Sequence, residues 1–117
     1  MTPEATVRHA GDVAIVDLAG KLTFGPSVSM IRTTIKNLVD SSHKNILLNL
    51  QGVTYVDSAA LGEMARCYVT VQKLGGSLKL VNARTQVTDL LHVTRLFQVF
   101  VSFSDESEAL RSFAAQA

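Results

Sequence analysis

The order of apolar and polar residues along the chain predicts five short strands. Residues 13–19 and 46–50 are almost continuously apolar, as expected for strands that other elements cover. Residues 5–9 are less apolar and are expected to pair with residues 13–19 across a short turn. Two further apolar runs, residues 78–81 and 99–103, are predicted to complete the sheet.

Between these strands, apolar residues recur at steps of three and four, which predicts helices. Pro26 suits the first position of a helix, where its missing N–H and fixed φ carry no penalty. The apolar stripe of this first helix consists of Val28, Ile31, Ile35 and Leu38. A second helix is expected to run from Ser58 to about Leu74, because Gly75 and Gly76 end the pattern.

Two shorter helices are predicted in the last third of the chain. One covers residues 85–93, with apolar side chains facing inward. The other is expected to be capped by Ser104 and to carry Asp105 and Glu106 in its first turn, where carboxylates complement the helix dipole.

This alternation of strands and helices predicts an α/β fold in a single domain over residues 1–117. An antiparallel start followed by parallel crossovers gives a mixed β-sheet with about four α-helices packed against it. Gly20 is expected to open a bend after the second strand, and a short polar turn is expected to join residues 46–50 to the helix at Ser58. In such sheets, functional residues collect where strands lead into helices, so the Asp57–Ser58 junction is the candidate site.

Composition narrows the possible functions. The chain has 117 residues, 47% of them hydrophobic, and a formal net charge of +1, so one soluble domain with a real core is expected. No run of basic residues indicates nucleic acid or an anionic membrane surface as a partner. No apolar run is long enough to cross a bilayer, and the start of the chain does not resemble a secretory signal, so a cytoplasmic location is expected. The single cysteine, Cys67, excludes an intramolecular disulfide and is interpreted as a packing residue.

Ser58 is the residue with the clearest candidate chemistry. The first N–H groups of a helix lack intrahelical partners and the helix dipole favours negative charge there, so a phosphate on Ser58 would be well accommodated. The alternative on local chemistry is that Asp57 or Ser58 merely caps the helix, and capping is the commoner role of these residue types.

Enzymatic and metal-binding functions find little support. The glycines do not fall into the spacing of a phosphate-binding loop or a dinucleotide fingerprint, and Ser58 lacks the flanking glycines of a nucleophile elbow. His9, His43 and His92 are scattered, without a second ligand at metal-binding spacing. We therefore expect no catalytic residue, no cofactor and no metal.

The chain resembles the STAS domains of bacterial anti-sigma factor antagonists over essentially its full length. In that family, a strand ending in Asn-Leu leads to Asp-Ser-(Ser/Thr)-Gly-Leu-Gly; here Leu48-Asn49-Leu50 leads to Asp57-Ser58-Ala59-Ala60-Leu61-Gly62, which matches four of the six motif positions. Residues 75–82, 87–97 and 104–110 resemble the family's later strand and helices. The combined match is more specific than the short motif alone.

The resemblance implies that Ser58 is the phosphoacceptor for a serine kinase that is itself the anti-sigma factor. Unphosphorylated, such a domain binds the anti-sigma factor and frees the sigma factor, and a phosphatase resets the switch. The implied partner-binding residues are Lys21, Thr23, Phe24, Asp57, Ala59 and Leu61. Leu61 is expected to be an exposed anchor, and Gly62 to allow close packing of the helix against a strand.

The sequence departs from the family pattern at two places. Ala59 and Ala60 replace a second hydroxyl residue and a glycine, which should stiffen the turn after Ser58 because alanine favours helix. Lys21 and Thr23 stand where many members have two carboxylates, and this exchange bears on partner specificity. Thr23 could be a second phosphoacceptor, although a solvated loop threonine is the favoured interpretation.

Two other function classes stay open. One is a STAS scaffold that is not phosphorylated, within a stress-signalling or lipid-transport assembly, and Ala59-Ala60 makes it credible. The other is a module that binds ATP or GTP directly. Incubation with a cognate kinase and titration with nucleotide distinguish the three.

Overall fold

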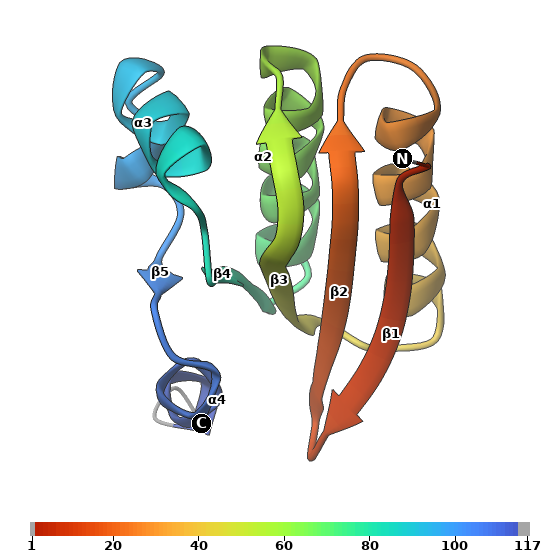
Figure 1. Cartoon of the computed structure of the whole chain (residues 1–117). Helices are drawn as coiled ribbons and strands as arrows, with labels where there is room; N and C mark the ends of the chain where they lie inside the picture. Colours follow the sequence, from red (N-terminus) through yellow and green to blue (C-terminus); the bar gives the residue numbers. More distant parts are fainter. Residues whose placement is uncertain (1, 115–117) are drawn as a thin grey trace.

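The computed structural model describes residues 2–114, which form a five-stranded sheet with helices on both faces (Figure 1). The strands, in their order in the sheet, are β1 (Glu4–Ala10), β2 (Val13–Leu22), β3 (Asn45–Val56), β4 (Ser77–Val81) and β5 (Ser102–Phe103). β1 pairs antiparallel with β2, and all other neighbours are parallel. The predicted α/β fold with a mixed sheet is confirmed.

Among residues 2–114, four α-helices alternate with the strands, as the sequence pattern predicts, and a 3₁₀ turn that was not predicted follows the third helix. They are α1 (Pro26–Asp40), α2 (Ser58–Lys73), α3 (Thr85–Val93), the 3₁₀ turn η1 (Leu96–Gln98) and α4 (Glu106–Ala114). The first three helices contribute to one core with one face of the sheet, and α4 packs against the other face.

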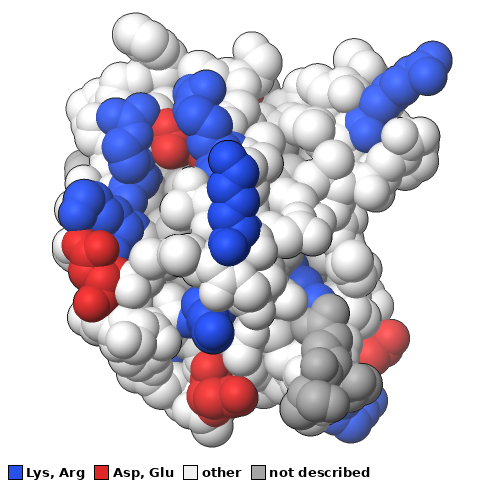
Figure 2. Space-filling view, turned by 180° about the vertical axis from the view of Figure 1, so that it is seen from behind, with Lys and Arg blue, Asp and Glu red and all other residues white. Residues whose placement is uncertain are grey.

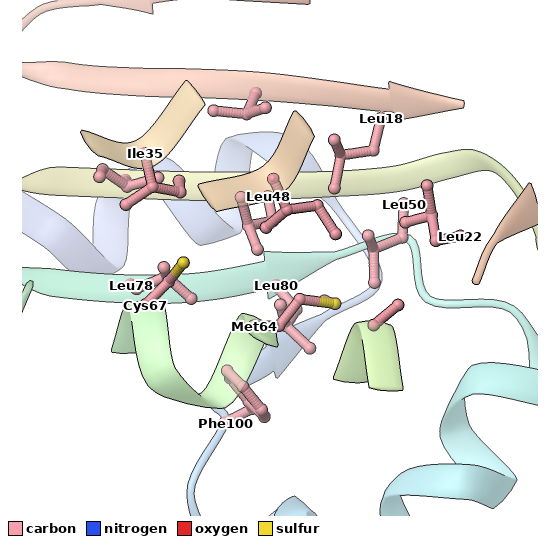
Figure 3. Packing of buried hydrophobic residues seen from close by; sticks show 14 of the residues in the cluster. Leu18, Leu22, Ile35, Leu48, Leu50, Met64, Cys67, Leu78, Leu80 and Phe100 are labelled. Carbon is pink, nitrogen blue, oxygen red and sulfur yellow. The ribbon is translucent and has the colours of Figure 1, made fainter. Parts of the chain in front are cut away.

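The main core lies between the sheet and α1, α2 and α3 (Figure 3). Its buried side chains include Leu22, Ile35, Leu48, Met64 and Leu80. Burial of this apolar surface is the main stabilising term of the fold, since each buried side chain of this size contributes about 1.5–3 kcal/mol. A smaller cluster under α4 is formed by Val13, Ile15, Leu47, Val81, Ala109 and Phe113.

β2 and β3 are longer than the hydrophobic pattern predicts. The predicted polar turn before Ser58 is wrong, because β3 continues through a bulge to Val56 and pairs with β2 as far as Leu22. Gly52 permits this bulge, since a β-carbon there would lie 3.0 Å from the Leu18 carbonyl oxygen. Gly20 does not end the strand either: it lies within β2 at φ 92°, a left-handed value that suits glycine.

The last part of the chain also differs from the predictions. Of the predicted strand over residues 99–103, only Ser102 and Phe103 form β5, and Val99 is the C-cap of η1 with helical backbone angles. Ser104 does not cap α4. Asp105 does, since its carboxylate accepts the Glu108 N–H at 3.0 Å, so the helix begins one residue later than predicted.

The loop between α2 and β4 passes very close to the start of β3. The Ser77 N–H donates to the Lys44 carbonyl oxygen at 2.9 Å. A β-carbon on Gly76 would lie 2.6 Å from the Lys44 Cβ and closer still to the Lys44 carbonyl oxygen. Only glycine can occupy this position without displacing backbone.

Candidate functional site

Asp57 organises the junction between β3 and α2. It is the N-cap of α2, and its Oδ1 accepts the Ala60 N–H at 2.9 Å. Its Oδ2 accepts the Phe24 N–H at 2.8 Å, and its own N–H donates to the Leu22 carbonyl oxygen at 3.0 Å. The Asp57 side chain therefore accepts a backbone N–H that has no partner within α2, and it also holds the loop between β2 and α1 beside the start of that helix.

Ser58 lies at the first position of α2, immediately after the cap, and is exposed to solvent. Within residues 2–114, its hydroxyl makes no hydrogen bond. Asp57, and not Ser58, thus caps α2. The Ser58 side chain has no capping role and stays accessible to solvent. Ser58 is the first residue of α2, at the end of a helix where unpaired N–H groups favour an anion, although Asp57 with its carboxylate is the preceding residue.

Three exposed side chains lie near this junction. Phe24, whose N–H is bound by Asp57, is 82% exposed, which is unusual for a large apolar residue. Lys21 and Tyr55 are register partners at the ends of β2 and β3, and both are exposed. Thr23, also predicted to contact the partner, is half-buried.

Sequence reasoning missed Tyr55. The sequence pattern predicts a turn before Ser58, whereas the place of these residues in β3 makes Tyr55 the register partner of Lys21, with its side chain exposed. The buried Val53 and Val56 on either side are the signal that could have found it.

Two expectations about the first turns of α2 are wrong. Leu61 is only 1% exposed and packs in the main core, so it is not an exposed anchor for a partner. A β-carbon on Gly62 would meet no atom of the described residues within 4 Å, so this glycine does not mediate close packing of α2 against a strand. Ala59, the third predicted contact in this turn, is half-buried beside Ser58.

The outer faces of α1 and α2 carry several basic side chains (Figure 2). Two of them, Arg32 and Arg66, lie at 2.8 and 3.5 Å from the carboxylate of Glu63, whose side chain is only 4% exposed. Burial of Glu63 would raise its pKa, but the hydrogen bond from Arg32 and the positive charges of both arginines outweigh it and hold the pKa below its usual value. Glu63 is therefore ionised and joins α1 to α2.

Cys67 packs behind this charged group, as its interpretation as a core residue requires. Burial, reinforced by the negative charge of Glu63, raises the pKa of the Cys67 thiol to about 12. Because only the thiolate is nucleophilic, a raised pKa leaves the thiol unreactive near neutral pH.

We expect iodoacetamide to alkylate Cys67 in the folded protein at pH 8 about a hundredfold more slowly than in urea. The rate is measured by mass spectrometry, and the Cys67→Ser variant confirms that no other group is labelled. Equal rates in the two states would contradict the burial and protonation described here.

Two other kinds of site were considered for residues 2–114: a metal centre and a membrane-spanning helix. Over residues 2–114, no group of three His, Cys, Asp or Glu side chains lies close enough together to hold a metal ion. Within the same part of the chain, no helix has both the length and the apolar character needed to span a membrane.

Comparison with known proteins places this geometry in a family. The STAS domain model matches residues 4–109. The anti-sigma F factor antagonist of Paenibacillus polymyxa is 26% identical over 111 residues, which cover 94% of each chain. An anti-sigma factor antagonist of Mycobacterium paratuberculosis has a similar structure, with a TM-score of 0.86, 18% identity and coverage of 97% and 95%.

Two further structures show the settings in which this fold occurs. The Bacillus cell fate determinant SpoIIAA in its phosphorylated form has a TM-score of 0.73 and 17% identity, with coverage of 93% of this chain and 98% of that chain. The murine solute carrier 26 family member A9, an anion transporter, gives 0.79 and 24% over 92% of this chain but only 18% of the transporter. Because the STAS domain model matches most of the present chain, the chain belongs to the STAS domain family.

Proposed function

We propose that this protein is an anti-sigma factor antagonist that a single phosphate on Ser58 switches. The observation that carries the proposal is the exposed Ser58 hydroxyl, which has no hydrogen-bond partner within residues 2–114, at the start of α2. Two comparisons support it: a relative of nearly the same length is named as an anti-sigma F factor antagonist, and a protein of the same fold is known in a phosphorylated form.

The proposed partner is an anti-sigma factor that is also a serine kinase. Unphosphorylated, the protein binds this kinase in the cytoplasm and the sigma factor is released; phosphorylated, it dissociates, and a phosphatase restores it. The kinase supplies the bound ATP and this chain supplies the hydroxyl, so the protein is a substrate and binding module with no catalytic residue of its own.

The proposed contact surface surrounds Ser58. It comprises Lys21, Thr23 and Phe24 from the end of β2 and the following loop, Asp57 and Ala59 beside the phosphoacceptor, and Tyr55. Phe24 is the proposed apolar anchor, because an aromatic ring exposed to this degree gains most when a partner covers it. Leu61 supports the surface from the core.

The test of the proposal is incubation of the protein with its cognate anti-sigma kinase and ATP. We expect one phosphate, mapped to Ser58 by mass spectrometry, and none on the Ser58→Ala variant. Ser29→Ala, which removes another exposed serine at a position on α1, is the matched control and should be phosphorylated normally. An unmodified wild-type protein, or a phosphate at Thr23 instead, would contradict the proposed switch.

A constitutive STAS scaffold is the second candidate, and two observations favour it. The fold also occurs as a small part of a membrane transporter. Ala60, in place of the family's glycine, is fully buried and held by Asp57, which makes the first turn of α2 rigid. The kinase experiment separates the candidates, since a scaffold would bind its assembly without modification of Ser58.

A further inference from the structure

β3 extends well beyond its neighbour β4. β4 pairs with β3 only from Asn45 to Asn49, so no strand within residues 2–114 lies beside the rest of β3 on that side. Buried backbone groups that lack a strand partner must find another one. In this region, side chains from the start of α3 supply it.

Gln86 acts in place of the missing strand at the end of β3. Its Oε1 accepts the Val56 N–H at 2.9 Å, and its Nε2 donates to the Val56 carbonyl oxygen, also at 2.9 Å. The amide therefore reproduces both hydrogen bonds that a neighbouring strand would make to one residue. Arg84 supports the same edge, with its guanidinium bound to the Gln51 carbonyl oxygen at 2.6 and 2.9 Å.

Val56 is the residue directly before the site. It is followed by Asp57, which must be oriented to cap α2 and to bind the Phe24 N–H at the same time. The position of Ser58 depends on that orientation, since the backbone from Val56 to Ser58 is continuous. A side chain on α3, 30 residues further along the chain than Val56, thus bears on the phosphoacceptor.

We infer that Gln86 is a positioning residue for the phosphorylation of Ser58. It fixes the carboxyl end of β3, so that the Ser58 hydroxyl is presented in one geometry to the kinase. This inference rests on the proposed function. It gives α3 a role in the switch, although α3 belongs neither to the exposed surface around Ser58 nor to the motif at residues 57–62.

The geometry also predicts that the effect is local. α3 is held in the main core by Val87 and Leu91, which do not depend on the Gln86 amide. Loss of the amide therefore leaves α3 in place and frees the backbone of Val56. Phosphoryl transfer is fastest when the Ser58 hydroxyl is held in the reactive orientation. Freeing the backbone beside it therefore lowers the rate of the chemical step more than it lowers the affinity for the kinase.

The test is the Gln86→Met variant, which keeps length and volume but removes both hydrogen bonds. With the cognate kinase and ATP, we expect kcat for Ser58 phosphorylation to fall about tenfold with KM changed much less. Hydrogen exchange should accelerate at the amides of residues 56–60 while the amides of α1 keep their protection. Phe113→Leu, a core change under α4, controls for a general loss of stability and should leave kcat unchanged.

Each outcome separates the inference from the proposed function. If wild-type protein is phosphorylated on Ser58 and Gln86→Met has the same kcat, the positioning role is wrong and the switch stands. If the wild-type protein is not phosphorylated, the proposed function itself is wrong. If Gln86→Met does not fold, Gln86→Asn, whose amide is one methylene too short to reach Val56, is measured in the same way. An unchanged kcat there overturns the inference.

Discussion

The Ser58→Asp variant is expected to bind the anti-sigma factor at least about a hundredfold more weakly than the wild type, which corresponds to about 2.8 kcal/mol. The added carboxylate lies next to that of Asp57, and a partner that covers the site must remove both charges from water. The variant should fold normally, because a negative charge at the first position of a helix is favourable. Isothermal titration calorimetry with the purified partner measures the loss.

Ser58→Asn is the matched control, because its side chain has the size and shape of aspartate without the charge. We expect it to bind within a few-fold of the wild type, although it cannot be phosphorylated. If the two variants lose the same affinity, the effect is one of shape. The charge mechanism would then be abandoned, while Ser58 could still belong to the contact surface.

Gly76→Ala is expected to lower the free energy of unfolding by about 3 kcal/mol. The new β-carbon would overlap the backbone of Lys44, which cannot move aside without breaking the hydrogen bond from Ser77 to its carbonyl oxygen. This contact sets the start of the β3–β4 pairing, where Asn45 lies opposite Ser77. Urea unfolding followed by circular dichroism measures the change.

Gly75→Ala, at the neighbouring position, is the control for the loss of stability expected of Gly76→Ala. Gly75 has φ 81°, and of the atoms in the described part of the chain a β-carbon there would meet only the Lys44 ammonium nitrogen, at 3.8 Å. The variant should lose about 1–2 kcal/mol from left-handed backbone strain alone. A Gly76→Ala protein no less stable than Gly75→Ala would show that the close approach at Lys44 is not as tight as described.

The hydrophobic pattern predicts the order and type of the elements well, because that information is local. The stripe on α1 and the end of α2 near Gly75 are both where the pattern places them. The pattern fails where long-range contacts decide. Gln51 and Gly52 have the composition of a turn, yet pairing with β2 carries the strand through them to Val56.

The candidate site, too, can be predicted from the sequence only in part. Asp57 and Ser58 are found from the sequence, since a strand, a capping residue and a helix follow one another directly. The family resemblance predicts an outward Leu61, but its spacing from Met64 and Cys67 is that of the buried stripe of α2, and all three are buried. The two hydrogen bonds between the Gln86 amide and the Val56 backbone could not be predicted, because no local sequence rule pairs residues so far apart in the chain.

The single, protonated cysteine in the core gives the protein a practical property. Because Cys67 is shielded, a second cysteine placed at an exposed position such as Thr33 or Val69 could be tagged with a fluorophore in the native sequence background. A dye at either position would report docking and release in real time by a change in energy transfer or anisotropy. The molecule is thus already suited to optical kinetics, without removal of its own thiol.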